Sequence, residues 1–248
     1  MASADAPPRI EVTEAKFKID LGDGRILQGM DLVGVILHLR NRAGEPIEIR
    51  IDSVASPAGN AASGVELYGL SRRNAGSAWS PLCKPGADGR ALGFPLPGTD
   101  DEDAEVAGNS FSIACTAGAR GKCVMLGYRP WATAVGSESL RPYFDSCVRM
   151  MRADYCGDGR SHTRAGVHVD MWDRAGVQKA RTDLPFEAAW GPDGALCLAH
   201  ARVPNISTLE EVLASCPRLA AHPAGDCESW SRRSDSGALI WNRSAIGD

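Results

Sequence analysis

The sequence lacks long apolar runs and any strong excess of one charge. No apolar run approaches the roughly 18 residues that can span a membrane, so we expect no transmembrane segment. Lys and Arg total 27 against 31 Asp and Glu, which gives a formal net charge of −4. The basic residues are scattered and form no patch of the kind that binds phosphate backbones. We therefore expect no nucleic-acid partner.

Motifs of the common enzyme classes are also missing. The sequence contains no G-x-S-x-G, no H-E-x-x-H, no P-loop and no G-x-G-x-x-G. His38, His168 and His200 have no second histidine at ligand spacing, which favours packed or surface histidines over metal ligands. Asp170 and Asp173 lie at a predicted strand end and the following turn, and they do not identify a glycosidase pair. We predict no metal and no cofactor.

Cysteine is the most informative residue that is present. None of the eight cysteines forms a C-x-x-C pair, so a zinc ribbon or a thioredoxin-like centre lacks its local geometry. We interpret the cysteines as structural disulfides, and the alternative is small buried thiols in a reduced core. Disulfides indicate a periplasmic or extracellular protein. The disulfide candidates are Cys83, Cys115, Cys123, Cys147, Cys156, Cys197, Cys216 and Cys227.

The N-terminal sequence does not match a secretory leader. Residues 1–12 contain neither a basic n-region nor an apolar h-region. The sequence as it stands therefore carries no signal peptide, which conflicts with the disulfide interpretation. We resolve the conflict by interpreting residue 1 as a mature start.

Alternating apolar and polar residues predict an antiparallel sheet in the first third of the chain. We expect a flexible lead at 1–15, a β-rich lobe at 16–70 and a long loop region at 71–110 that includes the acidic stretch Gly98–Glu105. Residues 41–44 are predicted to form a hairpin turn. The predicted strands are Lys16–Asp20, Val33–Arg40, Ile47–Asp52, Val65–Leu70 and a short one at Ala91–Phe94.

The rest of the chain mixes strands with two amphipathic helices. Leu140, Phe144 and Cys147 begin a helical period that ends near Asp154. Ser207 and Glu210 predict a capping box for a second helix, which Pro217 ends. Cys115 and Cys123 flank a predicted turn, where they could pair. The predicted strands are Phe111–Cys115, Lys122–Tyr128, Gly166–Trp172, Phe186–Trp190 and Ala195–Val203.

The expected architecture is α+β, antiparallel and β-rich, with two amphipathic helices and disulfide reinforcement. It forms either one elongated domain or two lobes.

Two segments carry a resemblance to a known family. Phe111–Trp131 and Cys147–Gly159 resemble the ADYC-domain family of exported bacterial proteins, and the family's name corresponds to Ala153, Asp154, Tyr155 and Cys156. The likeness covers the last three-fifths of the chain, so we place an ADYC-like α+β domain at 111–248. The resemblance implies export and supplies no established activity.

The densest polar cluster lies between Asp154 and His162. Cys156, His162 and either Asp158 or Asp154 would supply the thiolate, imidazole and carboxylate of a cysteine hydrolase. Alternatively, Cys147 and Cys156 form a disulfide that closes a loop at the helix end, and a cystine sulfur is no nucleophile. We favour the structural alternative.

Two functions remain open from the sequence. The first is an exported envelope or secreted module that binds an unknown protein, peptide or glycan, or is purely structural. Exposed tryptophans such as Trp79 and Trp131 would suit a peptide or glycan. The second is a secreted hydrolase or transferase that uses the Asp154–His162 loop.

Overall fold

The computed structural model describes residues 7–40, 44–56, 64–74, 76–98, 111–134, 136–221 and 224–247. The chain divides into two compact units, Met1–Met125 and Leu126–Asp248. Most of the turn predicted at 41–44 and of the acidic stretch that begins at Gly98 lies outside the described residues.

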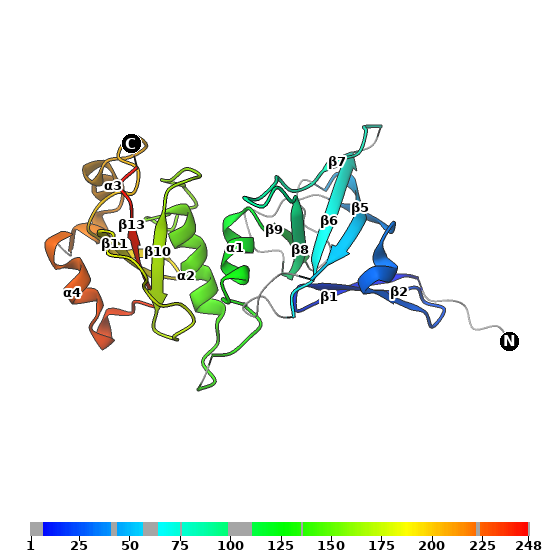
Figure 1. Ribbon diagram of the computed structural model, residues 1–248, viewed down its shortest axis with the longest axis horizontal. Helices are drawn as coiled ribbons and strands as arrows, with labels where there is room; N and C mark the ends of the chain where they lie inside the picture. Colours follow the sequence, from blue (N-terminus) through cyan, green and yellow to red (C-terminus); the bar gives the residue numbers. More distant parts are fainter. Residues whose placement is uncertain are drawn as a thin grey trace. The chain divides into compact units, whose positions relative to one another are not determined.

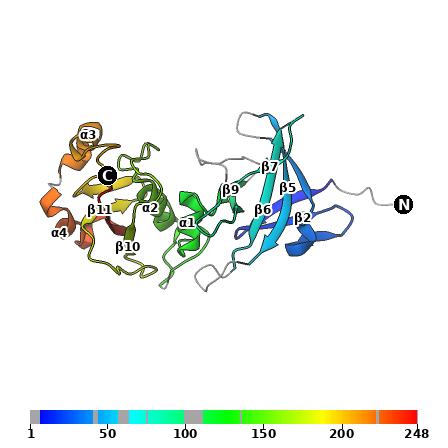
Figure 2. The same cartoon turned by 45° about the horizontal axis from the view of Figure 1, so that its top comes forward.

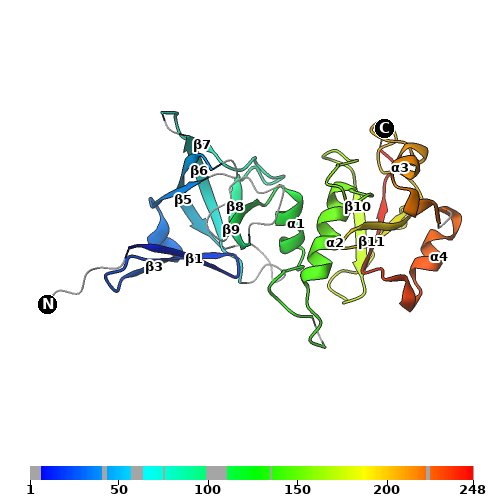
Figure 3. The same cartoon turned by 180° about the vertical axis from the view of Figure 1, so that it is seen from behind.

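The described residues of the first unit form two antiparallel sheets. The smaller has the strand order β1-β2-β3, and the larger has the order β4-β5-β6-β8-β9 with β7 paired to β6. The strands of the small sheet cross those of the large sheet at a steep angle (Figure 1 and Figure 3). The bounds are β1 Arg9–Thr13, β2 Lys16–Asp20, β3 Ile26–Gln28, β4 Ile36–Arg40, β5 Pro46–Ala55, β6 Leu67–Asn74, β7 Ser80–Pro81, β8 Leu92–Pro97 and β9 Phe111–Cys115.

Strand β5 shows the predicted alternation. Ile47, Ile49 and Ile51 are buried, whereas Glu48 and Arg50 between them are only half-buried. Apolar residues at every second position face the same side of a strand, so the three isoleucines face the core together. The strand predicted at Lys16–Asp20 is confirmed as β2 with the same bounds. The neighbouring predictions are confirmed as β4, β6 and β8, with ends shifted by a few residues.

An aromatic cluster joins the two sheets of the first unit. The Phe17 ring lies edge-on to Tyr68 and to Phe111, with ring centroids 5.1 and 5.4 Å apart. The Phe17 N–H donates to the Tyr68 hydroxyl at 3.1 Å, and that hydroxyl donates to Glu66 Oε2 at 2.6 Å. The cluster therefore satisfies a buried backbone donor while it packs the sheets together.

The strand predicted at Lys122–Tyr128 is wrong. Residues Ala119–Met125 form helix α1, which follows directly from the end of β9. Gly121 lies so close to the Cys115 carbonyl that a Cβ at this position would overlap it. The predicted alternation was too short to distinguish a strand from one buried helix face, and the glycine contact is visible only in three dimensions.

The pairing predicted between Cys115 and Cys123 is also wrong. Cys115 forms a disulfide with Cys83, with Cα atoms 5.4 Å apart. Proximity in sequence suggested the wrong partner, because Cys83 is 32 residues away and reaches Cys115 only through the fold.

The second unit is an antiparallel sheet with helices on both faces. Its strand order is β10-β13-β11-β12, so the last strand of the chain lies inside the sheet. Helix α2 lies on one side of this sheet and α4 on the other in all three views, including Figure 2. The bounds are α2 Arg141–Arg152, β10 Val169–Asp173, β11 Phe186–Gly191, β12 Gly194–Leu198, α3 Leu209–Ser215, α4 Cys227–Ser231 and β13 Ile240–Ser244.

The two predicted amphipathic helices are α2 and α3. Helix α2 buries Phe144, Cys147 and Met150 on one face, as the helical period indicated. The capping box of α3 is one residue later than predicted: the Thr208 hydroxyl accepts from the Glu211 N–H at 3.2 Å, and Glu211 Oε2 accepts from the Thr208 N–H at 2.8 Å. Either register fits the local pattern of the sequence.

The α+β, antiparallel and β-rich architecture is confirmed, and two short helices, α1 and α4, add to the predicted pair. In the described part of the chain, no helix has the length and apolar character needed to cross a bilayer.

We expect Tyr68→Phe to lower the free energy of unfolding of the first unit by about 1–3 kcal/mol, because the buried Phe17 N–H loses its acceptor. Urea denaturation followed by circular dichroism measures this change. Ser80→Ala removes an exposed hydroxyl and serves as the control, with an expected change within about 0.5 kcal/mol. Equal effects of the two substitutions would contradict the role given to Tyr68.

Candidate functional site

The segment Ala153–Cys156 connects the end of α2 to the sheet of the second unit. Ala153 lies in the left-handed region, with φ 50° and ψ 40°, and its N–H donates to the Met150 carbonyl at 3.0 Å. The Asp154 N–H donates to the Arg149 carbonyl at 2.9 Å. These bonds satisfy the last carbonyls of the helix and turn the chain away from its axis.

Asp154 holds the loop that follows the helix. Its side chain is buried, and Oδ2 accepts from Arg149 Nη1 at 2.5 Å and from the Gly159 N–H at 3.0 Å. Because this oxygen bonds both the helix and the loop, the carboxylate acts here as a turn-forming acceptor.

Tyr155 points into the core and stacks on Trp190, with ring centroids 5.5 Å apart. Its hydroxyl donates to Glu187 Oε1 at 3.1 Å and accepts from the Arg202 N–H at 2.9 Å. Burial and the adjacent Glu187 carboxylate raise the pKa of Tyr155 well above its ordinary value, so the hydroxyl stays protonated.

Glu187 and Arg202 form an ion pair in the core. Their side chains are 0% and 1% exposed, and Arg202 donates through Nε and Nη2 to the two carboxylate oxygens at 2.9 Å each. Burial alone would raise the pKa of the Glu187 carboxyl. The charge and hydrogen bonds of Arg202 outweigh burial, so the pKa is lowered and the pair is ionised.

Further hydrogen bonds complete this buried network. Arg202 Nη2 also donates to the Met150 carbonyl at 2.8 Å. Asn242 donates to Glu187 Oε2 at 2.7 Å and accepts from the Trp190 indole N–H at 2.7 Å. The network therefore links α2, β11 and β13, and its polar groups are satisfied within the protein.

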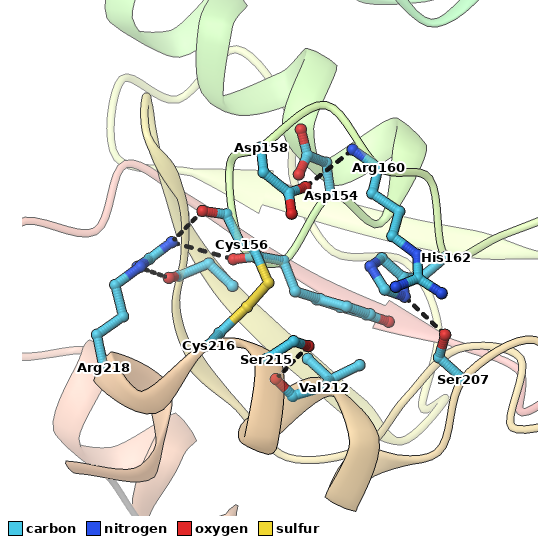
Figure 4. The surroundings of a disulfide bond; sticks show 12 residues. Asp154, Cys156, Asp158, Arg160, His162, Ser207, Val212, Ser215, Cys216 and Arg218 are labelled. Atoms are coloured by element: carbon cyan, nitrogen blue, oxygen red, sulfur yellow. Dashed lines mark hydrogen bonds between the residues drawn. A yellow bond between two sulfur atoms is a disulfide. The ribbon is translucent and has the colours of Figure 1, made fainter.

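Cys156 forms a disulfide with Cys216, at the end of α3, with Cα atoms 5.5 Å apart (Figure 4). The pairing of Cys156 with Cys147 is therefore wrong. The guanidinium of Arg218 donates to the carbonyls of Tyr155, Cys156 and Asp193 at 3.1, 3.2 and 3.1 Å. In this oxidised form Cys156 carries no thiolate.

Two glycines allow the Cys156 loop to pack against the β11–β12 turn. Gly157 has φ 73°, and a Cβ there would overlap the Asp193 carbonyl. Gly194 has φ 114°, and a Cβ there would lie 2.8 Å from the Gly157 nitrogen and the Tyr155 carbonyl. Only glycine fits this close backbone approach.

His162 is 2% exposed and joins the same loop to Ser207, which precedes α3. Its Nδ1 lies 2.8 Å from Ser207 Oγ, and this hydroxyl donates to the Ile206 carbonyl at 2.7 Å. Since the Ser207 proton is used, we assign the imidazole proton to Nδ1. Burial and the nearby Arg160 charge lower the pKa of His162, against the smaller opposite effects of Asp158 and Asp154.

The predicted catalytic residues lie around one loop but form no bonded triad. Asp158 accepts from the Arg160 N–H at 2.9 Å, Asp154 bonds Arg149, and Cys156 is oxidised. Among the described residues, no hydrogen bond joins His162 to either carboxylate. The arrangement in Figure 4 is that of a cross-linked turn.

A family model for the ADYC domain matches residues 29–204, which is more than half of the chain. The chain belongs to the ADYC domain family. The match begins well before Phe111, so it includes much of the first unit that the resemblance had left out. It ends at residue 204, before the end of the domain expected at 111–248. Comparisons with curated proteins and with solved structures give no match.

The name-giving residues of the ADYC domain thus occupy one structural junction. Sequence reasoning found this loop from its polar residues and the helix end. It missed Glu187 and Arg202, whose signal was a charged residue inside each of two predominantly apolar predicted strands. A charge at such a position is buried only when it has a partner.

Asp170 and Asp173 also shape loops in the second unit. Asp170 Oδ2 accepts from the Arg181 and Thr182 N–H groups at 2.7 Å each, and these bonds lower the pKa of Asp170 against the effect of burial. Asp173 Oδ2 accepts from the Tyr128 hydroxyl at 2.7 Å. Within the described residues, no three His, Cys, Asp or Glu side chains are grouped closely enough to hold a metal ion.

Trp79 and Trp131 are both half-buried. The guanidinium carbons of Arg50 and Arg73 lie 4.7 and 4.5 Å from the Trp79 ring centroid, so the protein's own cations cover this ring.

We expect Glu187→Gln to lower the free energy of unfolding of the second unit by about 3–5 kcal/mol, because Arg202 keeps a buried charge without its carboxylate. Urea titration monitored by tryptophan fluorescence measures the loss. Glu228→Gln, which weakens partly exposed ion pairs with Arg232 and Arg243, is the control and costs at most about 1 kcal/mol. Similar losses for both would show that the buried pair has no special role.

Protonation of His162 is expected to destabilise the fold in acid. Its pKa is lowered from 6.5, so below about pH 6.5 the unfolded chain binds more protons than the folded chain. The contribution of neutral His162 to the free energy of unfolding is therefore complete above that pH and is lost as the pH falls. We expect the free energy of unfolding of His162→Gln to change less between pH 7.5 and pH 5 than that of the parent chain. If the free energies of unfolding of the two chains changed in parallel with pH, this would contradict the role given to His162.

Proposed function

We propose that this ADYC protein is a non-catalytic binding or structural module that works outside the cytoplasm, in the bacterial envelope or as a secreted protein. The observation that carries this proposal is that no free cysteine remains among the described residues. Structural disulfides persist in oxidising compartments and are reduced in the cytosol.

The disulfides support the proposal because each one closes a long loop of the chain. Cys83–Cys115, Cys156–Cys216 and Cys197–Cys227 span 32, 60 and 30 residues. Each closes a loop long enough to stabilise the folded state by about 3–5 kcal/mol in the chain-entropy model. A protein that depends on such cross-links is suited to export.

The hydrogen bonds of the carboxylates support a non-catalytic role for this protein. Asp154, Asp158, Asp170 and Glu187 all accept hydrogen bonds from neighbouring backbone or arginine groups. Carboxylates satisfied in this way hold loops and core in place, whereas general acids and bases must reach a substrate proton. The oxidised Cys156 supplies no thiolate for the version of the alternative function that uses this residue as nucleophile.

The test compares the chain made with a cleavable export leader and without one in a bacterial host. Alkylation of thiols followed by non-reducing peptide mapping shows which cysteines are free. We expect the exported chain to have no labelled thiol and to contain the Cys156–Cys216 linkage. The cytoplasmic chain is expected to be reduced and to unfold at a lower temperature.

A double variant, Cys156→Ser with Cys216→Ser, tests the linkage directly. We expect it to unfold at a lower temperature than the exported parent chain. Reductant is expected to narrow this difference in unfolding temperature between the two chains. A rapidly labelled Cys156 in the exported chain, or equal stability of the oxidised and reduced chains, would overturn the proposal.

A further inference from the structure

A groove of about 910 Å³ lies between strands β1 and β4 of the first unit. Pro8 and all of β1 line one wall, and residues 38–40 of β4 line the other. β1 ends the small sheet and β4 ends the large one. Within the described residues, neither outer edge pairs with another strand.

The hydrogen bonds of the β1–β2 hairpin show which backbone groups of β1 are open. Val12 is paired with Phe17, whose N–H donates to Tyr68 and therefore points away from β1. This identifies a non-hydrogen-bonded pair, so the Val12 N–H and C=O point to the outer edge. Ile10, two residues earlier, has the same orientation.

Strand β4 also alternates between backbone groups that face its partner strand and groups that face outward. The Ile51 N–H donates to the Val35 carbonyl at 3.0 Å, so the outward-pointing positions that follow are 36, 38 and 40. Pro46, which has no N–H, is paired with Arg40, as a non-hydrogen-bonded position allows. Open donors and acceptors of His38 and Arg40 therefore lie at the second wall.

The side chains of the groove combine apolar surface with unpaired positive charge. Ile10, Val12 and Leu39 are half-buried. Within the described residues, Arg9 forms no ion pair, and Arg40 donates only to the Gly44 carbonyl at 2.7 Å. An extended chain with alternate apolar side chains and a carboxylate is complementary to this surface.

We propose that the groove binds an extended segment of another polypeptide, which adds as a strand to the outer edge of β1. Its backbone bonds Ile10 and Val12, its alternate apolar side chains contact Ile10, Val12 and Leu39, and a carboxylate pairs with Arg9 or Arg40. The inference rests on the binding role proposed above and names its surface and partner class.

The first measurement uses displayed random peptides of about ten residues, the upper length of ordinary strands, selected on the intact oxidised protein. Dissociation constants of an enriched peptide are then measured for the parent chain, Val12→Pro and Val12→Thr. Proline removes the outward N–H without touching the β1–β2 bonds, so we expect binding to weaken by about tenfold or more. Threonine keeps the N–H and is expected to weaken binding by less than about threefold.

A second measurement does not depend on the folding of a variant. Methylation of each backbone nitrogen of the peptide in turn should abolish binding to the parent chain at alternate positions and leave the positions between them tolerant. Arg9→Gln should reduce the salt dependence of binding, whereas Arg25→Gln, in a pair with Asp23 outside the groove, should leave it unchanged.

Three outcomes would overturn the proposal. The first is that no enriched peptide binds the parent chain more tightly than Val12→Pro, and the second is that the methylation series shows no alternation. The third is that the parent chain forms a dimer in light scattering and that Val12→Pro abolishes this dimer. The last would assign the groove to a second copy. If the chain still requires oxidation to fold, each of these leaves the extracytoplasmic role intact.

Discussion

The carboxylate of Glu187 and the guanidinium of Arg202 lie in the core of the second unit, and the surrounding elements are arranged to satisfy them. A charge in this place is tolerated only with a partner and with its remaining hydrogen bonds filled. Tyr155 donates a hydrogen bond to one oxygen of the Glu187 carboxylate, and Asn242 donates one to the other. The end of α2, strand β11 and the C-terminal strand β13 must therefore come together as one structure.

The ADYC residues contribute to this junction in four different ways. Ala153 turns the helix end, Asp154 accepts hydrogen bonds from helix and loop, and Tyr155 reaches the ion pair. Cys156 connects the junction to α3 through a disulfide. Each of the four residues of the motif therefore has a role in the fold.

The first unit has its polar groups at strand edges, whereas the second unit has a charged pair in its core. The core of the first unit is apolar and aromatic, and its open hydrogen-bonding capacity lies at strand edges. Edge strands are usually protected by charges, prolines or covering segments. β1 has flanking Pro8 and the exposed charges of Arg9 and Glu11, which limit uncontrolled pairing. The groove beside β1 and β4 restricts what could add to it.

The sequence by itself determined the local features of this protein. Periodicity in β5 and α2 predicted their buried faces, and the polar residues after α2 marked the junction loop. Local patterns failed at α1, where a short apolar run fits a strand or a helix, and at Thr208, where the capping box fits two registers. Each failure arose because short-range patterns leave neighbouring alternatives close in free energy.

Only the tertiary structure decided which distant groups meet. It paired Cys156 with Cys216 and Cys115 with Cys83, against the nearer partners that sequence proximity favoured. It also brought Arg202 to Glu187, and among the residues that the structure describes it left the outer edge of β1 without a strand. These outcomes depend on the packing of whole sheets and helices, because side-chain partners and open edges are set by contacts between residues far apart in the chain.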